Sequence, residues 1–282
     1  MPKKIIPKNL QQYFTKYLNV DNEKLLIVKT TKTFNIKNYD ELELIINIEK
    51  TNNFRYVNKF HENVNNVLIT GGIYISCAES LKQRKHRKEK KYLFLLKHIM
   101  LFIDFIYKRV LPKLPFMKKI YFLLTRGHNR VMTKIELIGR LISCGFEIIE
   151  IVEIDGLSYI VSKKIREPYF DMYPSYGPIF RMKRVGLQGK IISVYKFRTM
   201  SPYSEYTQKQ VIAENKLDLG GKIKDDYRIT FYGKFLRKYW IDEFPMIINW
   251  IKRELKLVGV RPLSQDYFSR YPKDLQKYRI KT

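Results

Sequence analysis

Short apolar runs that alternate with helical patterns constrain the fold of the N-terminal half most strongly. The runs at 24–30, 42–50 and 70–80 are rich in the aliphatic residues that favour strands. Segments 54–68 and 133–146 instead space their apolar residues three and four apart, as on one face of a helix. Strands that alternate with helices predict an α/β layer.

A β-hairpin is predicted to end this half, because two β-rich runs within 147–164 flank Asp155-Gly156. The order of strand, helix and terminal hairpin in residues 54–164 resembles the C-terminal half of Rossmann-like methyltransferases. The Gly-rich cofactor loop of that family has no counterpart, since "LLIVKTTKTFNIKNY" contains no glycine. We expect residues 1–165 to form a degenerate, methyltransferase-like α/β domain that does not bind S-adenosylmethionine.

An apolar segment near 92–124 interrupts this domain. In helical register Lys97, Asp104 and Lys108 fall on one narrow stripe, and the remainder of 93–106 is almost wholly apolar. No run reaches the roughly 18 uncharged residues of a simple transmembrane helix. The segment fits either a membrane interface or a helix pair buried under a larger domain. Basic flanks favour a membrane-associating insertion.

The charge balance points to a polyanionic partner. The chain has 282 residues and a formal net charge of +27, from 54 basic and 27 acidic residues. Nucleic acid, an anionic membrane and phosphorylated substrates all suit this excess. The two cysteines, Cys77 and Cys144, predict neither a disulfide framework nor a zinc site, and indicate a reducing cytosolic environment. The first residues lack the apolar core of a secretory signal.

A domain boundary is predicted at residues 166–176, which are rich in Pro and Tyr and lack periodicity. Two strand-like runs in 177–200 then predict a hairpin. Lys196 and Arg198 would point to the same face of its second strand, because strand side chains alternate. Two cations on one face suit a diphosphate, which Arg grips through two hydrogen bonds.

Two adjacent carboxylates, Asp242 and Glu243, stand inside the otherwise apolar run "KYWIDEFPMIINW". One reading is a capping pair at a helix N-terminus. The other is a reactive site, in which the helix start keeps Asp242 ionised as a nucleophile or metal ligand. Residues 255–262, "LKLVGVRP", are predicted to form a buried strand that delivers Arg261 to its end.

Four blocks in residues 177–275 resemble the bacterial sugar transferases, the monotopic phosphoglycosyl transferases. They are "GPIFRMKRVGLQGKIISVYKFRTM", "DDYRITFYGKFLRK", "IDEFP" and "LVGVRP". The resemblance implies transfer of a sugar 1-phosphate from a nucleotide diphosphate sugar to undecaprenyl phosphate, which initiates exopolysaccharide, capsule or O-antigen assembly. It implies that Asp242 is the nucleophile and that Glu243 assists catalysis and binds Mg²⁺. Our candidates for binding the substrate phosphates are Lys196, Arg198, Arg237 and Arg261.

The resemblance also implies a small α+β catalytic domain in 166–282 that acts at the cytoplasmic face of the bacterial inner membrane, as a peripheral or monotopic protein. The chain departs from the family pattern in three places. The expected re-entrant helix before the first block is replaced by "KKIREPYFDMYPSY", Val260 replaces a proline, and the chain ends where relatives usually continue. We expect no nucleic-acid partner and leave self-association open. The alternatives are an S-adenosylmethionine-dependent methyltransferase-like enzyme and a catalytically inactive basic binding module.

Overall fold

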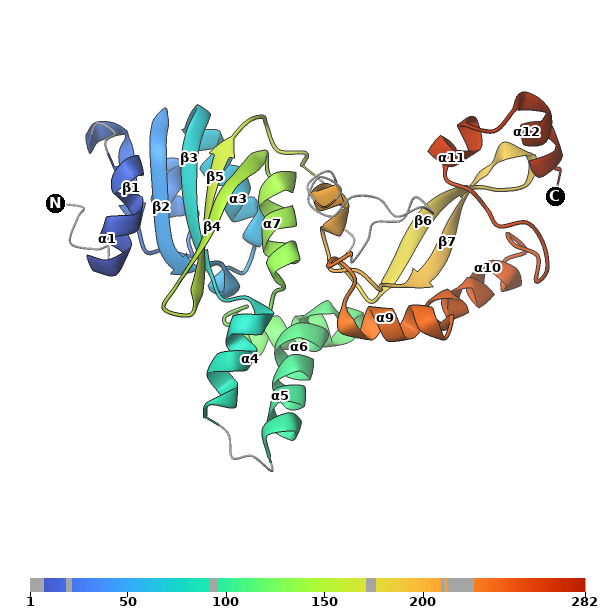
Figure 1. The fold of residues 1–282 in the computed structure, drawn as a ribbon, viewed down its shortest axis with the longest axis horizontal. Helices are drawn as coiled ribbons and strands as arrows, with labels where there is room; N and C mark the ends of the chain where they lie inside the picture. The colour runs from blue at the N-terminus through green and yellow to red at the C-terminus, as the bar shows by residue number, and fades with distance from the viewer. Residues whose placement is uncertain are drawn as a thin grey trace. The chain divides into compact units, whose positions relative to one another are not determined.

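The computed structural model describes residues 8–18, 22–91, 96–170, 176–208, 211 and 226–281. Parts of two predicted features, the apolar segment (92–95) and the domain boundary (171–175), lie outside these residues. The chain divides into two compact units (Figure 1). Unit 1 contains Met1–Pro174 and Pro202–Asp225, and unit 2 contains Ser175–Ser201 and Asp226–Thr282. The predicted division at 165/166 stays a prediction.

Unit 1 is built on a five-stranded sheet with the order β1-β2-β3-β5-β4 (Figure 1). The strands are β1 Leu25–Val28, β2 Leu42–Lys50, β3 Leu68–Ala78, β4 Phe146–Ile154 and β5 Leu157–Lys164. The first three are parallel, and β5 runs antiparallel to both of its neighbours. This mixed sheet with its helices confirms the predicted α/β class. The closer likeness to methyltransferases stays a prediction.

Both faces of the sheet carry an apolar core. The helices that pack around it are α1 Lys8–Phe14, α2 Phe34–Lys37, α3 Val57–Val67 and α7 Lys134–Ser143. One core joins α2, α3 and α7 to the sheet through side chains such as Phe60, Tyr74 and Leu141. The second core joins α1 to the other face through Leu10 and Phe14. Two covered faces explain why the central strands read as continuous apolar runs.

The β4–β5 hairpin confirms the turn predicted from Asp155-Gly156. Both residues have positive φ, 51° and 73°, which is the geometry of a tight primed turn. Short 3₁₀ turns complete unit 1 and the hairpin of unit 2. They are η2 Thr15–Tyr17, η3 Asn22–Lys24, η4 Thr51–Asn53, η7 Leu187–Gly189 and η8 Ser204–Thr207.

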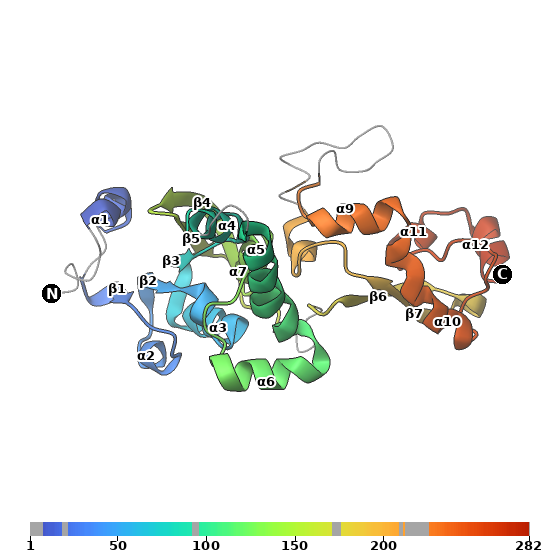
Figure 2. The ribbon, with the colours of Figure 1, turned by 90° about the horizontal axis from the view of Figure 1, so that it is seen from below.

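A group of helices lies between β3 and α7 in the chain (Figure 2). It consists of α4 Leu81–Glu89, α5 Lys97–Phe105, η5 Ile106–Val110, η6 Leu111–Lys113 and α6 Pro115–Thr125. The predicted polar stripe of α5 faces α4, because Lys97 pairs with Glu89 at 3.6 Å and Asp104 with Arg84 at 2.7 Å. Within the described residues, no helix combines the length and apolar character needed to cross a membrane.

Unit 2 contains the predicted hairpin, β6 Ile179–Val185 and β7 Ile191–Phe197. Its helical elements are α9 Phe231–Lys238, η9 Ile241–Met246, α10 Ile247–Ile251, α11 Gln265–Ser269 and α12 Lys273–Arg279. The buried strand predicted at 255–262 is wrong: the segment pairs with no strand, and Leu257 and Val258 are 82% and 87% exposed. The prediction rested on the apolar residues of this segment. Such residues form a strand only where neighbouring strands or helices bury them.

Helix α9 approaches the end of β7 closely at Gly233, which leaves no room for a larger side chain there. A Cβ at this position would lie 2.0 Å from the carbonyl oxygen of Thr199. We expect Gly233→Ala to destabilise unit 2 by about 1–3 kcal/mol, despite the better helix propensity of alanine. Urea unfolding followed by tryptophan fluorescence reports on this unit, because both tryptophans, Trp240 and Trp250, lie in it.

Gly177→Ala is the matched control, since its nearest neighbouring atom would lie 4.0 Å from the new Cβ. An unfolding midpoint for Gly233→Ala as high as that of the control would contradict the close approach.

Candidate functional site

A break in the helix positions the two adjacent carboxylates of unit 2. Helix α9 ends at Lys238, and Trp240 adopts the left-handed conformation with a φ of 59° before η9 begins. This left-handed conformation costs a non-glycine residue about 1 kcal/mol or more, so it marks a sharp break between α9 and η9. The sequence predicted the interruption near Pro245, but the chain turns five residues earlier, before Asp242 and Glu243.

Asp242 and Glu243 occupy the first turn of η9. No side chain forms a cap hydrogen bond at this turn, so the structure does not show the two carboxylates acting as N-caps. Both side chains are half-buried. Their neighbours differ, and this difference defines two adjoining parts of the site.

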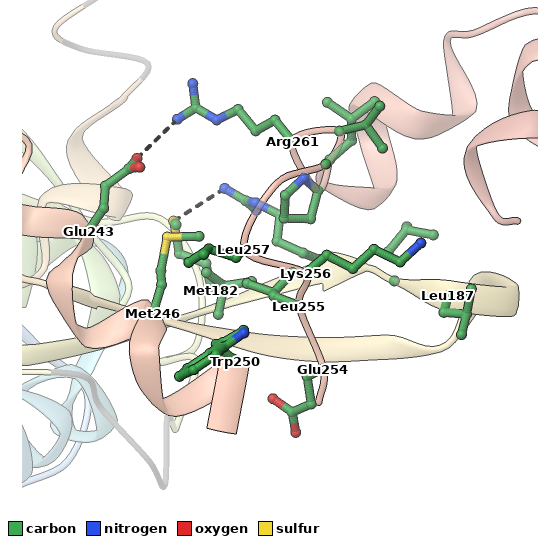
Figure 3. Close-up of a pocket in the computed structure, with 18 of the residues that line it drawn as sticks. Met182, Leu187, Glu243, Met246, Trp250, Glu254, Leu255, Lys256, Leu257 and Arg261 are labelled. Atoms are coloured by element: carbon green, nitrogen blue, oxygen red, sulfur yellow. Dashed lines mark hydrogen bonds and ion pairs between the residues drawn. The ribbon is translucent and has the colours of Figure 1, made fainter. Parts of the chain in front are cut away.

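Glu243 faces two cations that arrive from different segments. The Nζ atom of Lys196, on β7, donates a hydrogen bond to Glu243 Oε1. Arg261 Nη2, from the loop after α10, lies 3.9 Å from the same oxygen (Figure 3). Lys196 is nearly buried, whereas the Arg261 side chain is 81% exposed. The structure therefore brings three of the predicted site residues together around one carboxylate.

These three residues lie on a cavity of about 690 Å³, within the size range of small-molecule sites. Six cationic side chains line it, Arg184, Lys196, Arg253, Lys256, Arg261 and Arg279, against two carboxylates, Glu243 and Glu254. Burial and the nearby charge of Arg261 lower the pKa of Arg184. The cavity thus holds more positive charge than its own carboxylates balance, and an anionic ligand would relieve the repulsion.

The apolar part of the cavity wall includes Met182, Met246 and Trp250 (Figure 3). Buried Asn249 holds the helix that carries Trp250 against β7. Its amide donates to Ser193 O at 2.8 Å, and its oxygen accepts from Tyr195 N at 3.0 Å. An apolar wall beside a cationic one suits a ligand with a charged group and a less polar body.

Asp242 has a different charged neighbour, Arg237. Burial lowers the pKa of Arg237, and the charges of Asp242 and Asp226 oppose this effect. Arg237 Nε donates to Thr199 Oγ1 at 2.9 Å, which fixes the guanidinium near the start of η9. Residues five positions apart, such as Arg237 and Asp242, do not share one face of an unbroken helix. The break at Trp240 allows their charges to interact. Neither Asp242 nor Arg237 is among the residues that line the cavity.

Arg198 is placed apart from the other candidates. Its side chain is buried at 9% exposure, and its Nε donates to Gly177 O at 2.8 Å. It does not line the cavity. Alternation along β7 therefore did not suffice to predict its surroundings, because β7 ends at Phe197. Its assignment as a phosphate ligand stays a prediction.

Sequence reasoning missed Arg253, Lys256 and Arg279 as cavity residues. Arg279 Nη2 donates to the carbonyl oxygen of Arg261 at 2.7 Å, so α12 supports the loop that carries Arg261. The two residues are 18 positions apart, and no local pattern announces their contact. Arg253 carried a weak signal, as a charged residue two positions before the predicted strand.

A metal site made by protein side chains alone is not present in the part of the chain that the structure describes, where no group of three or more His, Cys, Asp or Glu side chains converges. Mg²⁺ does not require one, since it commonly binds one or two carboxylates, water and the phosphates of its substrate. Glu243 fits this pattern, because its carboxylate borders a cavity that is suited to phosphate. The predicted Mg²⁺ therefore agrees with the donors present but stays a prediction.

Comparison with known proteins finds similarity over the C-terminal part of the chain. The family model described as bacterial sugar transferase matches residues 171–282. Galactosyl transferase CpsE of Streptococcus agalactiae serotype III (strain NEM316) is 42% identical over 106 residues, which are 37% of this chain and 23% of that protein. Undecaprenyl-phosphate galactose phosphotransferase of Salmonella typhimurium is 38% identical over 108 residues, 36% of this chain and 23% of that protein.

A third relative is the UDP-glucose:undecaprenyl-phosphate glucose-1-phosphate transferase of Klebsiella pneumoniae. It is 35% identical over 108 residues, which are 38% of this chain and 21% of that protein. The chain thus spans about a quarter of the length of these curated relatives. The match to the family model, over residues 171–282, includes the residues that line the cavity and both carboxylates.

Proposed function

We propose that the chain transfers a sugar 1-phosphate from a nucleotide diphosphate sugar to undecaprenyl phosphate, because residues 171–282 match the bacterial sugar transferase family model. Two of the relatives carry names for this kind of transfer, with galactose and glucose as the sugars. The observation that carries the proposal is the meeting of Lys196, Glu243 and Arg261 at a cavity with excess positive charge.

In the first step, a carboxylate oxygen of Asp242 attacks the phosphorus that bears the sugar. A bond from this oxygen to phosphorus forms, the bond between phosphorus and the bridging oxygen breaks, and a nucleoside monophosphate leaves. In the second step, an oxygen of undecaprenyl phosphate attacks the same phosphorus and releases the Asp242 carboxylate. Splitting the transfer in two lets one carboxylate serve both substrates in turn.

The cations supply charge stabilisation during both steps. Lys196 and Arg261 border the cavity and would hold the diphosphate oxygens, while Arg237 would stay beside the attacking carboxylate. Arg198, as the fourth predicted phosphate ligand, would act from the end of β7. Phosphoryl transfer needs positioning and charge compensation more than further covalent chemistry, which fits this set of residues.

Glu243 would hold Mg²⁺ together with oxygens of the nucleotide diphosphate. The ion would neutralise charge that develops on the leaving phosphate. In the structure, Lys196 and Arg261 both contact the half-buried Glu243 carboxylate. Glu243 therefore serves to position a cation at the cavity in either case.

We propose that the reaction takes place at the cytoplasmic membrane face, in the initiation of an exopolysaccharide, capsule or O-antigen. The undecaprenyl-phosphate acceptor in the relatives' names supports a location at a membrane. For unit 1 we retain the proposal of a methyltransferase-like scaffold. It is supported by the parallel strands β1–β3 followed by the reversed strand β5.

The decisive experiment is a screen for nucleoside monophosphate release over a panel of nucleotide sugars. The full chain would be tested in membranes, with and without added undecaprenyl phosphate and with Mg²⁺ or EDTA. We expect one nucleotide sugar to give release that needs both the acceptor and Mg²⁺ for turnover. Absence of release from every nucleotide sugar, with an active relative as positive control, would overturn the proposal and favour the inactive binding module.

A further inference from the structure

Helices α5 and α6 of unit 1 expose a large apolar face. On α6 the exposed apolar residues recur at positions 116, 117, 120, 123 and 124, which share one side of a helix. Phe116 is 88% exposed and Leu123 is 80% exposed. On α5, Phe102 and Ile103 are also more than half exposed. This exposure disagrees with a helix pair buried inside unit 1, which was one of the two readings of the sequence.

The opposite side of the same helices is anchored to unit 1 by buried ion pairs. Asp104 of α5 accepts two hydrogen bonds from Arg84 of α4, at 2.7 and 2.8 Å. Arg109 of η5 pairs with Glu136 of α7 at 3.0 Å, and Lys113 of η6 lies 3.5 Å from the same carboxylate. These contacts fix which face of α5 and of the segment after it turns toward the rest of unit 1. The apolar side chains on the opposite face therefore point outward.

The helices that carry this apolar face, and α4 before them, are strongly basic. Residues 81–125 contain 13 Lys and Arg against two acidic residues, Glu89 and Asp104, and both of these are ion-paired. The exposed cations of α4, its C-terminal end and α6 are Lys82, Lys85, Arg87, Lys90, Lys91, Lys119 and Arg126. An apolar helix face with basic flanks complements an anionic lipid surface, where the cations meet headgroups and the apolar residues enter the acyl boundary.

We propose that helices α4, α5 and α6 form a docking surface for an anionic lipid bilayer, with α5 and α6 lying in the membrane interface. A protein partner or a second copy would also cover apolar residues, but neither explains the charge excess as directly. The surface lies in unit 1, outside residues 171–282, and the inference does not depend on the transferase reaction.

A fluorescent probe at Leu124 tests this surface in the full chain. Both native cysteines are buried, and burial raises the pKa of the Cys77 and Cys144 thiols to about 11 and about 12, so neither competes for a thiol-reactive dye. In Leu124→Cys carrying an environment-sensitive dye, we expect a blue shift on vesicles of phosphatidylglycerol and phosphatidylcholine. Brominated lipids should quench the dye.

Phe34→Cys is the matched control, because Phe34 is an equally exposed apolar residue of α2 in the same unit, at 71%. Its dye should not shift on the same vesicles. Lys85→Gln and Lys119→Gln should each weaken vesicle binding about fivefold at low salt. A chain that sediments with the vesicles without a shift at position 124 would overturn the proposal. So would a shift that appears without lipid and grows with protein concentration, which would indicate self-association.

Discussion

Asp242→Asn is expected to reduce nucleoside monophosphate release to background, a loss of at least about 10³-fold. The amide oxygen of asparagine cannot accept the phosphosugar as a carboxylate does, and it carries no charge to pair with Arg237. Asparagine has nearly the same shape, so the fold of η9 should persist. The measurement is the initial rate of release with the nucleotide sugar identified by the screen.

Two further measurements distinguish a nucleophile from a residue that only shapes the site. When undecaprenyl phosphate is withheld, mass spectrometry should find the sugar phosphate attached to Asp242 in the native chain and unmodified peptide in the variant. Asp274→Asn is the control, because Asp274 is an exposed aspartate in the first turn of α12 in the same unit. Turnover by Asp242→Asn at the rate of this control would refute the mechanism.

Much of the fold could be predicted because it depends on local patterns. Strand β2 has the predicted bounds, 42–50, and the turn at Asp155-Gly156 follows from a residue pair that tolerates positive φ. Helix α7 follows from its apolar spacing. The order of the strands across the sheet depends on pairing between segments that are distant in the sequence. Local patterns in residues 24–164 do not predict it.

Part of the candidate site could be predicted, because its residues lie in the sequence blocks that resemble the bacterial sugar transferases. Lys196, Glu243 and Arg261 were selected from three separate segments and meet at one cavity. The left-handed conformation of Trp240 could not be predicted, because tryptophan has no intrinsic preference for it. The segment 255–262 was wrongly predicted as a strand, because its apolar composition suggests burial while no element of the described structure covers residues such as Leu257 and Val258.

Glu136→Gln is the change expected to affect stability most. Glu136 is 2% exposed and contacts Arg109, Lys113 and Arg140, with both shorter pairs at 3.0 Å. Glutamine keeps the shape but leaves three cations with no buried counter-charge, which we expect to destabilise unit 1 by about 3–5 kcal/mol. Unit 1 contains both cysteines and no tryptophan, so the urea dependence of thiol reactivity reports its unfolding.

Glu150→Gln is the control, because Glu150 forms a partly exposed pair with Lys16 at 2.9 Å. Such exposed pairs contribute little to stability, because water screens them. An equal effect of both changes would show that the Glu136 network is not a stabilising feature of the fold.

The same network predicts how the difference between wild type and Glu136→Gln depends on pH. The nearby charges of Lys113, Arg109 and Arg140 outweigh burial and hold the pKa of Glu136 far below its ordinary value of 4.5. A carboxyl with a depressed folded-state pKa stabilises the fold fully above its unfolded pKa, and this contribution is lost as the pH falls below that value. The stability of the native chain should therefore decline below about pH 4.5 more steeply than that of the variant, and the two should converge.

Because Arg109 and Lys113 belong to the segment that joins α5 to α6, the variant should also exchange the amide hydrogens of α5 and α6 faster at neutral pH. Convergence without this faster exchange would mean that Glu136 stabilises α7 alone, and that the apolar face of α5 and α6 is held outward by Asp104 and α4.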